Sequence, residues 1–360
     1  MTIMKQSDYH NILVIGNGFD VHHKINSKYV DFVEFYLKEE NINTIIKEFK
    51  NEEHIDEYTE EKTSIKEICQ NNMWLQLIRK LKSSYDDRWC SLEELIGDVI
   101  IKVNEYDKQQ KTGHLSTKDI GDPADIIGSF ILIRTMRNRN YIVFEKFAKQ
   151  LERDLSRLKF LLQKYLIYIY KSSIIAKDND IQLLFDHGYI DHVLSFNYTS
   201  TIKDYYLNDN QSVDVCNVHG DLNDYHNMVF GTNVYIENKE KLYSSFYKKK
   251  QTIINKNDNK FLTWSKNDVC EVALFYGFSF GISDTSLIKY LYDKCRIFYI
   301  CYYDKKAKAD ILDNLMNIFG REIIENDVDT KRIVFIEKLN DENLVSKLEE
   351  SAFNVGFNNS

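Results

Sequence analysis

The sequence predicts an α/β protein in which a parallel sheet is interrupted by a large helical insertion. Three observations support this fold class. A short apolar run, Ile12–Ile15, ends at a glycine, as buried parallel strands often do. Residues from about 40 to 186 are rich in Lys, Glu, Leu and Ile with helical spacing. Beyond residue 186, apolar runs alternate with helical patterns, which is typical of units in which a crossover helix joins two parallel strands.

The composition is that of a folded globular protein. The chain has 360 residues, of which 43% are hydrophobic and 13% aromatic, and it has a single proline. A chain of this length buries roughly 75% of its unfolded surface, and the aromatic content excludes disordered and collagen-like proteins. With 47 basic and 55 acidic side chains, the net charge of -8 argues against a general nucleic-acid-binding protein.

The first strand is expected to be followed by a loop and then by a helix. Ser27 resembles a helix N-cap in front of an apolar face that begins at Tyr29. Within the insertion, the segment from Ser91 to Glu94 matches a capping box behind Trp89, which is expected to pack the insertion against the sheet. Residues 108–124 are polar, contain the only proline and are predicted to form a loop.

Six further runs in the second half of the chain are predicted to be strands. They are Ile190–Phe196, Val213–Val218, Met228–Phe230, Val272–Tyr276, Arg296–Tyr302 and Arg332–Ile336. Helical patterns follow two of them, at residues 285–293 and 306–319. The predicted organisation is a Rossmann-like core of residues 1–39 and 187–360, with a helical insertion of residues 40–186.

The six cysteines contain no C-x-x-C pair, so the sequence has no zinc-ribbon spacing. No signal peptide is evident before the first strand, and the most apolar helical stretch, residues 158–175, is interrupted by three lysines. Cysteines without a targeting segment are expected to be free thiols in a reducing compartment. The sequence therefore predicts a soluble cytoplasmic protein that is not inserted in a membrane.

A glycine-containing turn after the first strand is the first candidate binding element. In the segment Gly16-Asn17-Gly18-Phe19-Asp20, two glycines allow the backbone to approach a phosphate closely, and turn amides can bind anions. Val21 occupies the position of the third glycine of a dinucleotide fingerprint, and the next helix is expected to begin only near Ser27. These two features disfavour an ordinary dehydrogenase. A turn without a ligand is the alternative.

Two later strands end at polar side chains. Asn197 follows the strand that ends at Phe196, and His219 follows the next strand. Ligands of open α/β sheets bind just outside the carboxyl ends of the strands, and an imidazole can accept a proton near neutral pH. For each residue taken alone, a turn-forming asparagine and a structural histidine are the alternatives.

A further strand, Val272–Tyr276, is followed by Gly277, Ser279 and Asp284. The glycine allows close approach and the serine offers a hydroxyl. The aspartate either caps the next helix or binds a ribose hydroxyl. In a parallel sheet these strand ends converge on one edge, together with the glycine turn and the two polar residues described above. That convergence predicts a site.

Two other polar segments are predicted to lie outside the site. His22 and His23 are adjacent, so their side chains point apart, and no carboxylate or cysteine lies at ligand spacing. We expect them to be loop residues without a metal. The run Lys248-Lys249-Lys250 is expected to be a solvated basic turn, with contact to phosphates as the alternative.

Taken together and in this order, the motifs resemble those of the AbiH family of bacterial phage abortive-infection proteins. The matching segments are Ile15-Gly16-Asn17-Gly18-Phe19-Asp20, Ser27-x-Tyr29-x-Asp31-Phe32, Trp89-x-x-x-Glu93, Ser195-Phe196-Asn197-Tyr198-Thr199, Val218-His219-Gly220-Asp221-Leu222, Phe230-Gly231, and Tyr276-Gly277-Phe278-Ser279 with Asp284. They span nearly the whole chain. The resemblance implies a role in phage defence.

The same order of motifs also resembles a remote sirtuin-like fold, which implies that the chain binds NAD⁺. On that resemblance, Asn197 and His219 flank the nicotinamide ribose, and Gly16–Asp20 and Gly277–Ser279 surround the phosphates and adenosine. The paired C-x-x-C zinc module of sirtuins is absent, which argues against a protein deacetylase. Thr199 stands where many sirtuin-like proteins have an aspartate.

The resulting expectation is an NAD⁺ glycohydrolase with NAD⁺ as its substrate and no metal. Asn197 would orient the ribose or the attacking water, His219 would act as general base, and Asp20 would stabilise positive charge at the anomeric carbon. One alternative is a nucleotide-sensing or interaction module that triggers a partner. Another is a nuclease that binds a metal through Asp20, Asp221 and Asp284. The expected partners are NAD⁺ or a related nucleotide and a phage component that acts as trigger, and a homo-oligomer is left open.

Overall fold

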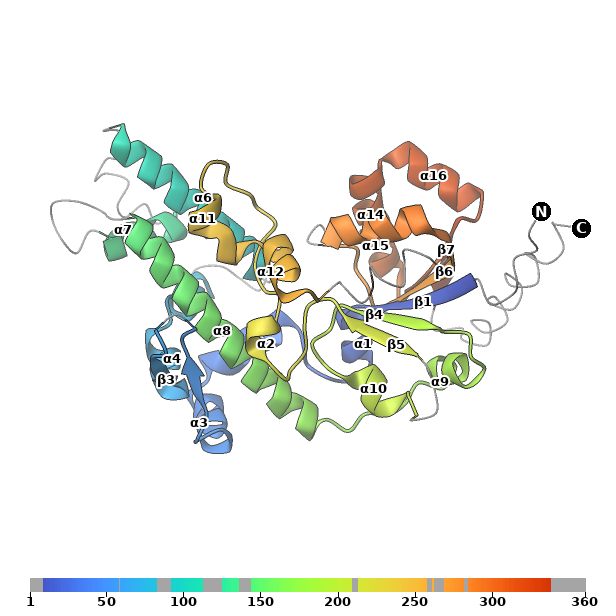
Figure 1. Cartoon of the computed structure of the whole chain (residues 1–360), viewed down its shortest axis with the longest axis horizontal. Coiled ribbons are helices and arrows are strands. Elements are labelled where there is room, and N and C mark those ends of the chain that lie inside the picture. Colours follow the sequence, from blue (N-terminus) through green and yellow to red (C-terminus); the bar gives the residue numbers. More distant parts are fainter. Residues whose placement is uncertain are drawn as a thin grey trace, which may run out of the picture. The chain divides into compact units, whose positions relative to one another are not determined.

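The predicted parallel sheet is present in a computed structural model of the chain (Figure 1). The structure describes residues 9–57, 59–82, 92–112, 125–135, 144–208, 213–257, 261, 269–281 and 284–337. Contacts between Cα atoms divide the chain into two units. The sheet unit comprises residues 1–25, 173–221 and 256–360, and the helical unit comprises residues 26–172 and 222–255. Residues 26–39 and 222–255, which the sequence analysis placed in the core, thus belong to the helical unit.

Six strands form the sheet, and every neighbouring pair is parallel. They are β1 (Tyr9–Ile15), β4 (His192–Ser195), β5 (Asp214–Asn217), β6 (Val269–Tyr276), β7 (Cys295–Tyr302) and β8 (Ile333–Glu337), in the spatial order β5-β4-β1-β6-β7-β8. β1 lies inside the sheet, where Leu13 pairs with Val193 of β4 and with Leu274 of β6. The predicted α/β class with a parallel sheet is confirmed.

Helices cover both faces of the sheet (Figure 1). One face carries α14 (Thr285–Lys294), α15 (Lys305–Phe319) and α16 (Arg321–Asp329), and the other carries α1 (Asn17–His22), α9 (Asn179–Asp186) and α10 (Thr201–Tyr205). Successive side chains of a strand point to opposite faces. Ile12 and Val14 therefore pack on the side of α14, and Leu13 and Ile15 pack on the side of α1. The continuous apolar run of β1 is explained by burial on both faces.

The helical unit is built around one long helix, α8 (Phe144–Ser172). Trp74 is buried and donates its indole N–H to the carbonyl oxygen of Leu151 at 2.9 Å. The carboxylate of Asp154 accepts the backbone N–H of Met73 at 2.9 Å, at the start of the helix that carries Trp74. Burial raises the pKa of Asp154.

No helix within the described ranges has both the length and the apolar character needed to cross a membrane.

The remaining elements of the helical unit are shorter. They are α2 (Tyr29–Leu37), α3 (Glu39–Glu48), β2 (Glu53–Ile55), β3 (Lys62–Ser64), α4 (Ile65–Asn71), α5 (Met73–Lys82), α6 (Leu92–Lys111), α7 (Ile126–Thr135), η3 (Tyr225–Asn227), α11 (Glu240–Tyr243), η4 (Ser244–Phe246) and α12 (Lys248–Asn255). A capping box that the sequence analysis did not identify starts α4: the backbone N–H of Ser64 donates to the carboxylate of Glu67 at 3.0 Å, and that of Glu67 donates to Oγ of Ser64 at 3.3 Å.

The helix that follows the first strand begins at Asn17, so the prediction of a late start near Ser27 is wrong. Lys28, not Ser27, occupies the N-cap position of α2, without a side-chain cap. A six-residue helix that contains a glycine has little intrinsic stability. Tertiary packing holds it, because Phe19 and Asp20 are buried. The late start therefore no longer counts against a dinucleotide-binding turn.

The predicted strand Met228–Phe230 is not a strand, although all three side chains are fully buried. The side-chain amide of Gln251 accepts the backbone N–H of Phe230 at 2.9 Å and donates to its carbonyl oxygen at 2.9 Å. One side chain thus supplies the donor and the acceptor that a neighbouring strand would supply. The apolar run reflects burial rather than sheet pairing.

Part of the predicted loop at residues 108–124 is helical, because α6 extends to Lys111. Residues 113–124 lie outside the described residues, as do Trp89 and Ser91 of the predicted capping box. A polar, lysine-rich helix end resembles a loop in sequence, which explains the error.

Two of the cysteines form a disulfide, so the prediction that all of them are free thiols is wrong. The pair is Cys270 and Cys295. Among the described residues, Cys69, Cys216 and Cys301 are buried and lie outside this disulfide. Burial raises the pKa of the Cys69 thiol to about 12, so that thiol is unreactive near neutral pH.

Candidate functional site

The carboxyl ends of neighbouring strands bring most of the predicted site residues to one edge of the sheet. Asn197 and His219 follow β4 and β5, and the segments Gly16–Asp20 and Gly277–Asp284 follow β1 and β6. The spatial order of the strands reverses between β1 and β6, because β4 and β5 extend the sheet on one side and β7 and β8 on the other. Open α/β sheets bind ligands at such a switch point.

The glycines at this switch point allow two backbone segments to touch. Gly16 N donates to Tyr276 O at 3.2 Å and Gly18 N donates to Gly277 O at 2.8 Å. A Cβ on Gly18 would lie 2.7 Å from Cα of Gly277, and Gly277 itself has a φ of +61°, which side chains rarely tolerate. Packing therefore explains these glycines without a ligand. Phosphate binding by the turn stays a prediction.

The other two residues of the turn have different environments. Asn17 is exposed, whereas the Phe19 ring is buried among the residues that pack on the face of α1. The backbone N–H of Phe19 donates to the carbonyl oxygen of Gly16 at 2.9 Å. The amides of Gly18 and Phe19 are thus used within the protein, and the exposed Asn17 is better placed to meet a ligand.

Asn197 is buried, with 5% of its surface exposed, and it links two turns. Its Nδ2 donates to the carbonyl oxygen of Gly16 at 3.0 Å, which joins the turn after β4 to the turn after β1. Its backbone N–H donates to Oγ of Ser195 at 3.2 Å. One half of the Asn197 amide thus has a structural partner, and its predicted role beside a ribose stays a prediction.

Asp20 is buried, with 1% of its surface exposed. Thr199 Oγ1 donates to its carboxylate, 2.7 Å from Oδ2, and Thr201 Oγ1 donates to Oδ1 at 3.0 Å. These bonds attach α1 to the first residue of α10 and to the segment that precedes this helix. The predicted electrostatic role of Asp20 beside a sugar ring stays a prediction, and the contacts show a structural role.

His219 and Asp284 form a pair, with Nε2 of the imidazole 3.0 Å from Oδ1 of the carboxylate. Their side chains are 10% and 16% exposed. The ring of Phe196 meets the imidazole edge-on, with centroids 5.3 Å apart. Asp284 occupies the N-cap position of α14, yet its side chain makes no capping bond. The sequence predicted that Asp284 either caps the helix or binds a ligand. In the structure its side chain instead contacts His219.

A neutral imidazole carries one proton, and the nitrogen that faces Asp284 must be the donor, because a carboxylate oxygen accepts and does not donate. With the proton on Nε2 and directed at Asp284, the lone pair is on Nδ1. The described residues provide no hydrogen-bond partner for that Nδ1. A histidine held in this way by a carboxylate can accept a proton from a substrate or a water.

The segment between β6 and α14, which carries Asp284, has an unusual backbone. Phe280 has a φ of +57° and is fully buried, with its ring centroid 4.6 Å from that of Phe275. A bulky residue in this region of φ is strained, and such strain is frequent at functional sites. Ser279 is exposed, and its carbonyl oxygen accepts Nδ2 of Asn314 at 2.9 Å.

A second polar cluster lies on the face that carries α1. His22 is the last residue of α1 rather than a loop residue, and its Nε2 lies 3.0 Å from Oδ2 of Asp178. Tyr276 donates its hydroxyl to the same oxygen at 3.0 Å. His23 is buried and contacts the hydroxyl of Tyr206. Sequence spacing alone could not identify Asp178, because it lies far along the chain and reads as a helix N-cap.

Lys248 in the helical unit is buried, so the prediction of a solvated basic turn is wrong at this position. Its side chain is 4% exposed, and Nζ lies 3.0 Å from Oε1 of Glu93. The hydroxyl of Tyr29 donates to the same carboxylate at 3.4 Å. Glu93 and Tyr29, both of which belong to the motifs described above, thus meet inside the helical unit. Lys249 and Lys250 are exposed.

The carboxylates of the nuclease alternative have other partners. Asp20 contacts two threonines, and Asp284 contacts His219. Across the ranges that the structure describes, no group of three or more His, Cys, Asp or Glu side chains is arranged to hold a metal ion. The nuclease alternative stays a prediction.

A comparison with models of protein families identifies a family for this chain. The sequence model of a family described as "Bacteriophage abortive infection AbiH" matches residues 12–301. That range includes the glycine turn, the His219–Asp284 pair and the whole helical unit. A search of curated proteins found no match.

Proposed function

Because the chain belongs to the AbiH family of bacteriophage abortive-infection proteins, which gives it a role in phage defence, we propose that it acts by hydrolysing NAD⁺ to nicotinamide and ADP-ribose. Loss of NAD⁺ would stop the metabolism of an infected cell before the phage completes its cycle. The reaction would take place in the cytoplasm, without a metal, after a phage component acts as trigger.

The topology of the sheet supports a dinucleotide as ligand. Numbered along the chain, the six strands have the order 3-2-1-4-5-6, which is the order of doubly wound sheets that bind dinucleotides. In those sheets a glycine turn leads from the first strand directly into a helix, as Gly16 does here. A fold does not determine a function, so the proposal depends on the residues at the edge.

The His219–Asp284 pair is the observation that carries the proposal. Asp284 fixes the imidazole through Nε2, and Nδ1 takes the proton of a water that attacks the anomeric carbon. The water oxygen forms the new bond to that carbon while the bond to the nicotinamide nitrogen breaks. The ring of Phe196 beside the imidazole lowers the local dielectric constant, which strengthens the interaction of the pair.

Asn197 and Asp20 would act in ways that fit their structural bonds. Asn197 uses Nδ2 to hold Gly16, so its Oδ1 would accept a hydrogen bond from a ribose hydroxyl or from the water. Asp20 is buried beside Thr199 and would stabilise the positive charge of an oxocarbenium-like transition state from a distance. Exposed Asn17 and Ser279 would contact the remainder of the dinucleotide.

A nucleotide-sensing module that triggers a partner is the second candidate. The observation in its favour is that the amides of Gly18 and Phe19, half of the Asn197 amide and the Asp20 carboxylate all have partners within the protein. A site with so many satisfied groups can bind a ligand without reacting with it.

Product analysis distinguishes the candidates. The full chain is incubated with NAD⁺, with and without Mg²⁺ and DNA, in the presence of a phage lysate as trigger, and the products are separated. We expect nicotinamide and ADP-ribose from the wild type and from His187→Ala, which replaces an exposed histidine of the same unit, but not from His219→Ala. Saturable binding of NAD⁺ without turnover would favour the sensor, and Mg²⁺-dependent cleavage of DNA would favour the nuclease.

A further inference from the structure

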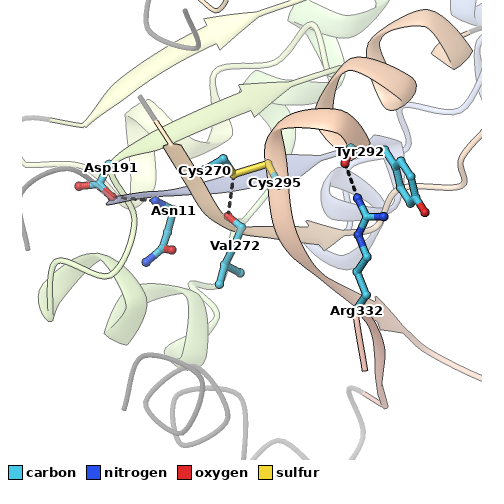
Figure 2. Close-up of a disulfide and its surroundings, with 7 residues drawn as sticks. All are labelled: Asn11, Asp191, Cys270, Val272, Tyr292, Cys295 and Arg332. Atoms are coloured by element: carbon cyan, nitrogen blue, oxygen red, sulfur yellow. Dashed lines mark hydrogen bonds between the residues drawn. A yellow bond between two sulfur atoms is a disulfide. The ribbon is translucent and has the colours of Figure 1, made fainter. Parts of the chain in front are cut away.

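The disulfide joins β6 to β7 at the ends of the strands that lie opposite the candidate site. Figure 2 shows Cys270 and Cys295 bridging the two strands. The two residues are direct partners in the register of the parallel pair, with Cα atoms 4.4 Å apart. They are 5% and 3% exposed, within the apolar cluster on the face of α14.

The bridge closes a ring that contains one complete strand–helix–strand unit. The sequence separation is 25 residues, and the ring includes β6, the strained segment at Gly277 and Phe280, Asp284 and helix α14. The residue that orients His219 is therefore carried by the covalently closed part of the chain. β4 and β5, which carry Asn197 and His219, lie outside the ring.

Next to the bridge, the pairing of β6 with β1 is interrupted. His10 pairs with Cys270 and Asn11 with Val272, so Glu271 is an extra residue that forms a bulge. The carboxylate of Glu271 forms an ion pair with Arg296, which follows Cys295 on β7. At this end of β6, the attachment to β7 thus depends on the bridge and on that ion pair, in addition to the backbone ladder.

We propose that the Cys270–Cys295 disulfide is a redox-dependent link that controls how often the β6–α14–β7 unit opens. A dithiol reductant attacks one sulfur as its thiolate, a mixed disulfide forms, and the second thiol of the reductant releases the protein. Two electrons and two protons pass to the protein, which becomes a dithiol, and the reductant becomes a disulfide. The link is independent of the reaction catalysed at the sheet edge.

Reduction should loosen this unit and spare the rest of the sheet. Without the bridge, a ring of this size regains the conformational entropy that cross-linking removes from the open state. Opening of residues 270–295 should then become more frequent by on the order of 10²-fold. Strands β4 and β5 should be protected to the same extent in both redox states.

Thiol counting and hydrogen exchange on the full chain test the proposal. Alkylation in denaturant without reductant should leave Cys270 and Cys295 unlabelled, and prior reduction with dithiothreitol should expose both. Amide exchange in β6, α14 and β7 should accelerate on reduction in the wild type and in Cys216→Ser, which changes another buried cysteine of the sheet unit. The double variant Cys270→Ser/Cys295→Ser should exchange, with and without reductant, as fast as the wild type does after reduction.

Two results would overturn the proposal. One is the labelling of both cysteines in protein that was never reduced. The other is an exchange pattern for residues 270–295 that is the same before and after reduction. The comparison of oxidised with reduced wild type decides the matter even where the double variant does not fold.

Discussion

At the scale of single residues, the polar side chains at the sheet edge differ in how many of their hydrogen-bonding atoms already have a partner within the protein. Asp20 accepts from two threonine hydroxyls, and Asn197 donates to Gly16. His219 has one partner, Asp284, and the described residues leave its second nitrogen open. Asp20 and Asn197 therefore hold turns in place. Of these three residues, His219 is the one with a nitrogen that can accept a proton.

Replacing Asn197 by alanine should destabilise the protein, because the carbonyl oxygen of Gly16 loses one of its two donors and keeps only the backbone N–H of Phe19. The free energy of unfolding should fall by about 0.5–1.5 kcal/mol, measured as a shift of the urea midpoint at constant slope. Asn314→Ala is the matched control, since its Nδ2 also donates to a backbone carbonyl but at an exposed position. Equal stability of Asn197→Ala and the wild type would contradict the bond.

Replacing His219 should affect turnover more than binding. His219→Ala should lower kcat by ~10²-fold or more if the imidazole transfers the proton, with little change in the affinity for NAD⁺. In the wild type, kcat/KM should fall at acidic pH, because a general base works only in its neutral form. A flat pH profile would remove His219 from the mechanism.

At the scale of elements, a buried histidine in the β2–β3 hairpin makes the stability of the helical unit dependent on pH. His54 of β2 is fully buried and its Nε2 lies 3.0 Å from Oγ of Ser156 on α8. Burial lowers the pKa of His54 to about 4, and the positive charges of Arg157 and His226 act in the same direction. The hairpin thus packs on α8 through a histidine that must stay neutral.

Acidification should therefore weaken the helical unit. A histidine of the unfolded chain has a pKa of ~6.5, so between that value and about 4 the unfolded state binds more protons than the folded state. The stabilisation is complete above the unfolded pKa and is lost as pH falls through this window, by roughly 3 kcal/mol. Urea unfolding at several pH values should show this slope, and His54→Gln should reduce it, whereas His187→Gln at an exposed position should not.

Strands and helices with strong apolar patterns could be predicted from the sequence, and elements that depend on distant partners could not. Ile12–Ile15 of β1 and Val272–Tyr276 of β6 are continuous apolar runs because both faces of the sheet are covered. Helix α1 was missed because its residues have low helix propensity and are held by tertiary packing. The run at Phe230 was misread because its partner is the side chain of Gln251 rather than another strand.

The same limit applies to the candidate site. Sequence position at a strand end was enough to select His219 and Asp284 separately. Their contact could not be foreseen, because they are 65 residues apart and an aspartate in front of a helix normally caps it. The cluster around Asp178 and His22 was missed for the same reason.

At the scale of the whole molecule, each unit is assembled from separate segments of the chain. The helical unit needs residues 222–255 as well as residues 26–172. The second segment supplies Lys248 to Glu93 and places Phe246 beside Trp74, with ring centroids 6.2 Å apart. The buried side chains of each segment thus have contact partners in the other segment.

A fragment of residues 26–172 should therefore not fold as the full unit does. We expect the two segments joined by a short Gly-Ser linker to melt cooperatively, and residues 26–172 alone to melt at a lower temperature or without cooperativity. Circular dichroism during heating measures both. A cooperative transition of residues 26–172 at the same temperature as the joined segments would show that residues 222–255 contribute little.

The central position of β1 has a consequence for how the protein is made. Ile12 pairs with His192 and with Ala273, so the second partner of the first strand is synthesised about 260 residues later. At ~5–20 residues per second, β1 waits about 13–50 s on the ribosome before β6 exists. β4 is synthesised earlier, about 180 residues after Ile12, so during the last part of that time β1 has a partner on one side only and its other edge needs protection from aggregation. A ribosome that stops before residue 284 leaves a product without Asp284, so an incomplete chain lacks the partner that holds His219 and, on the proposed function, would be harmless to the cell that makes it.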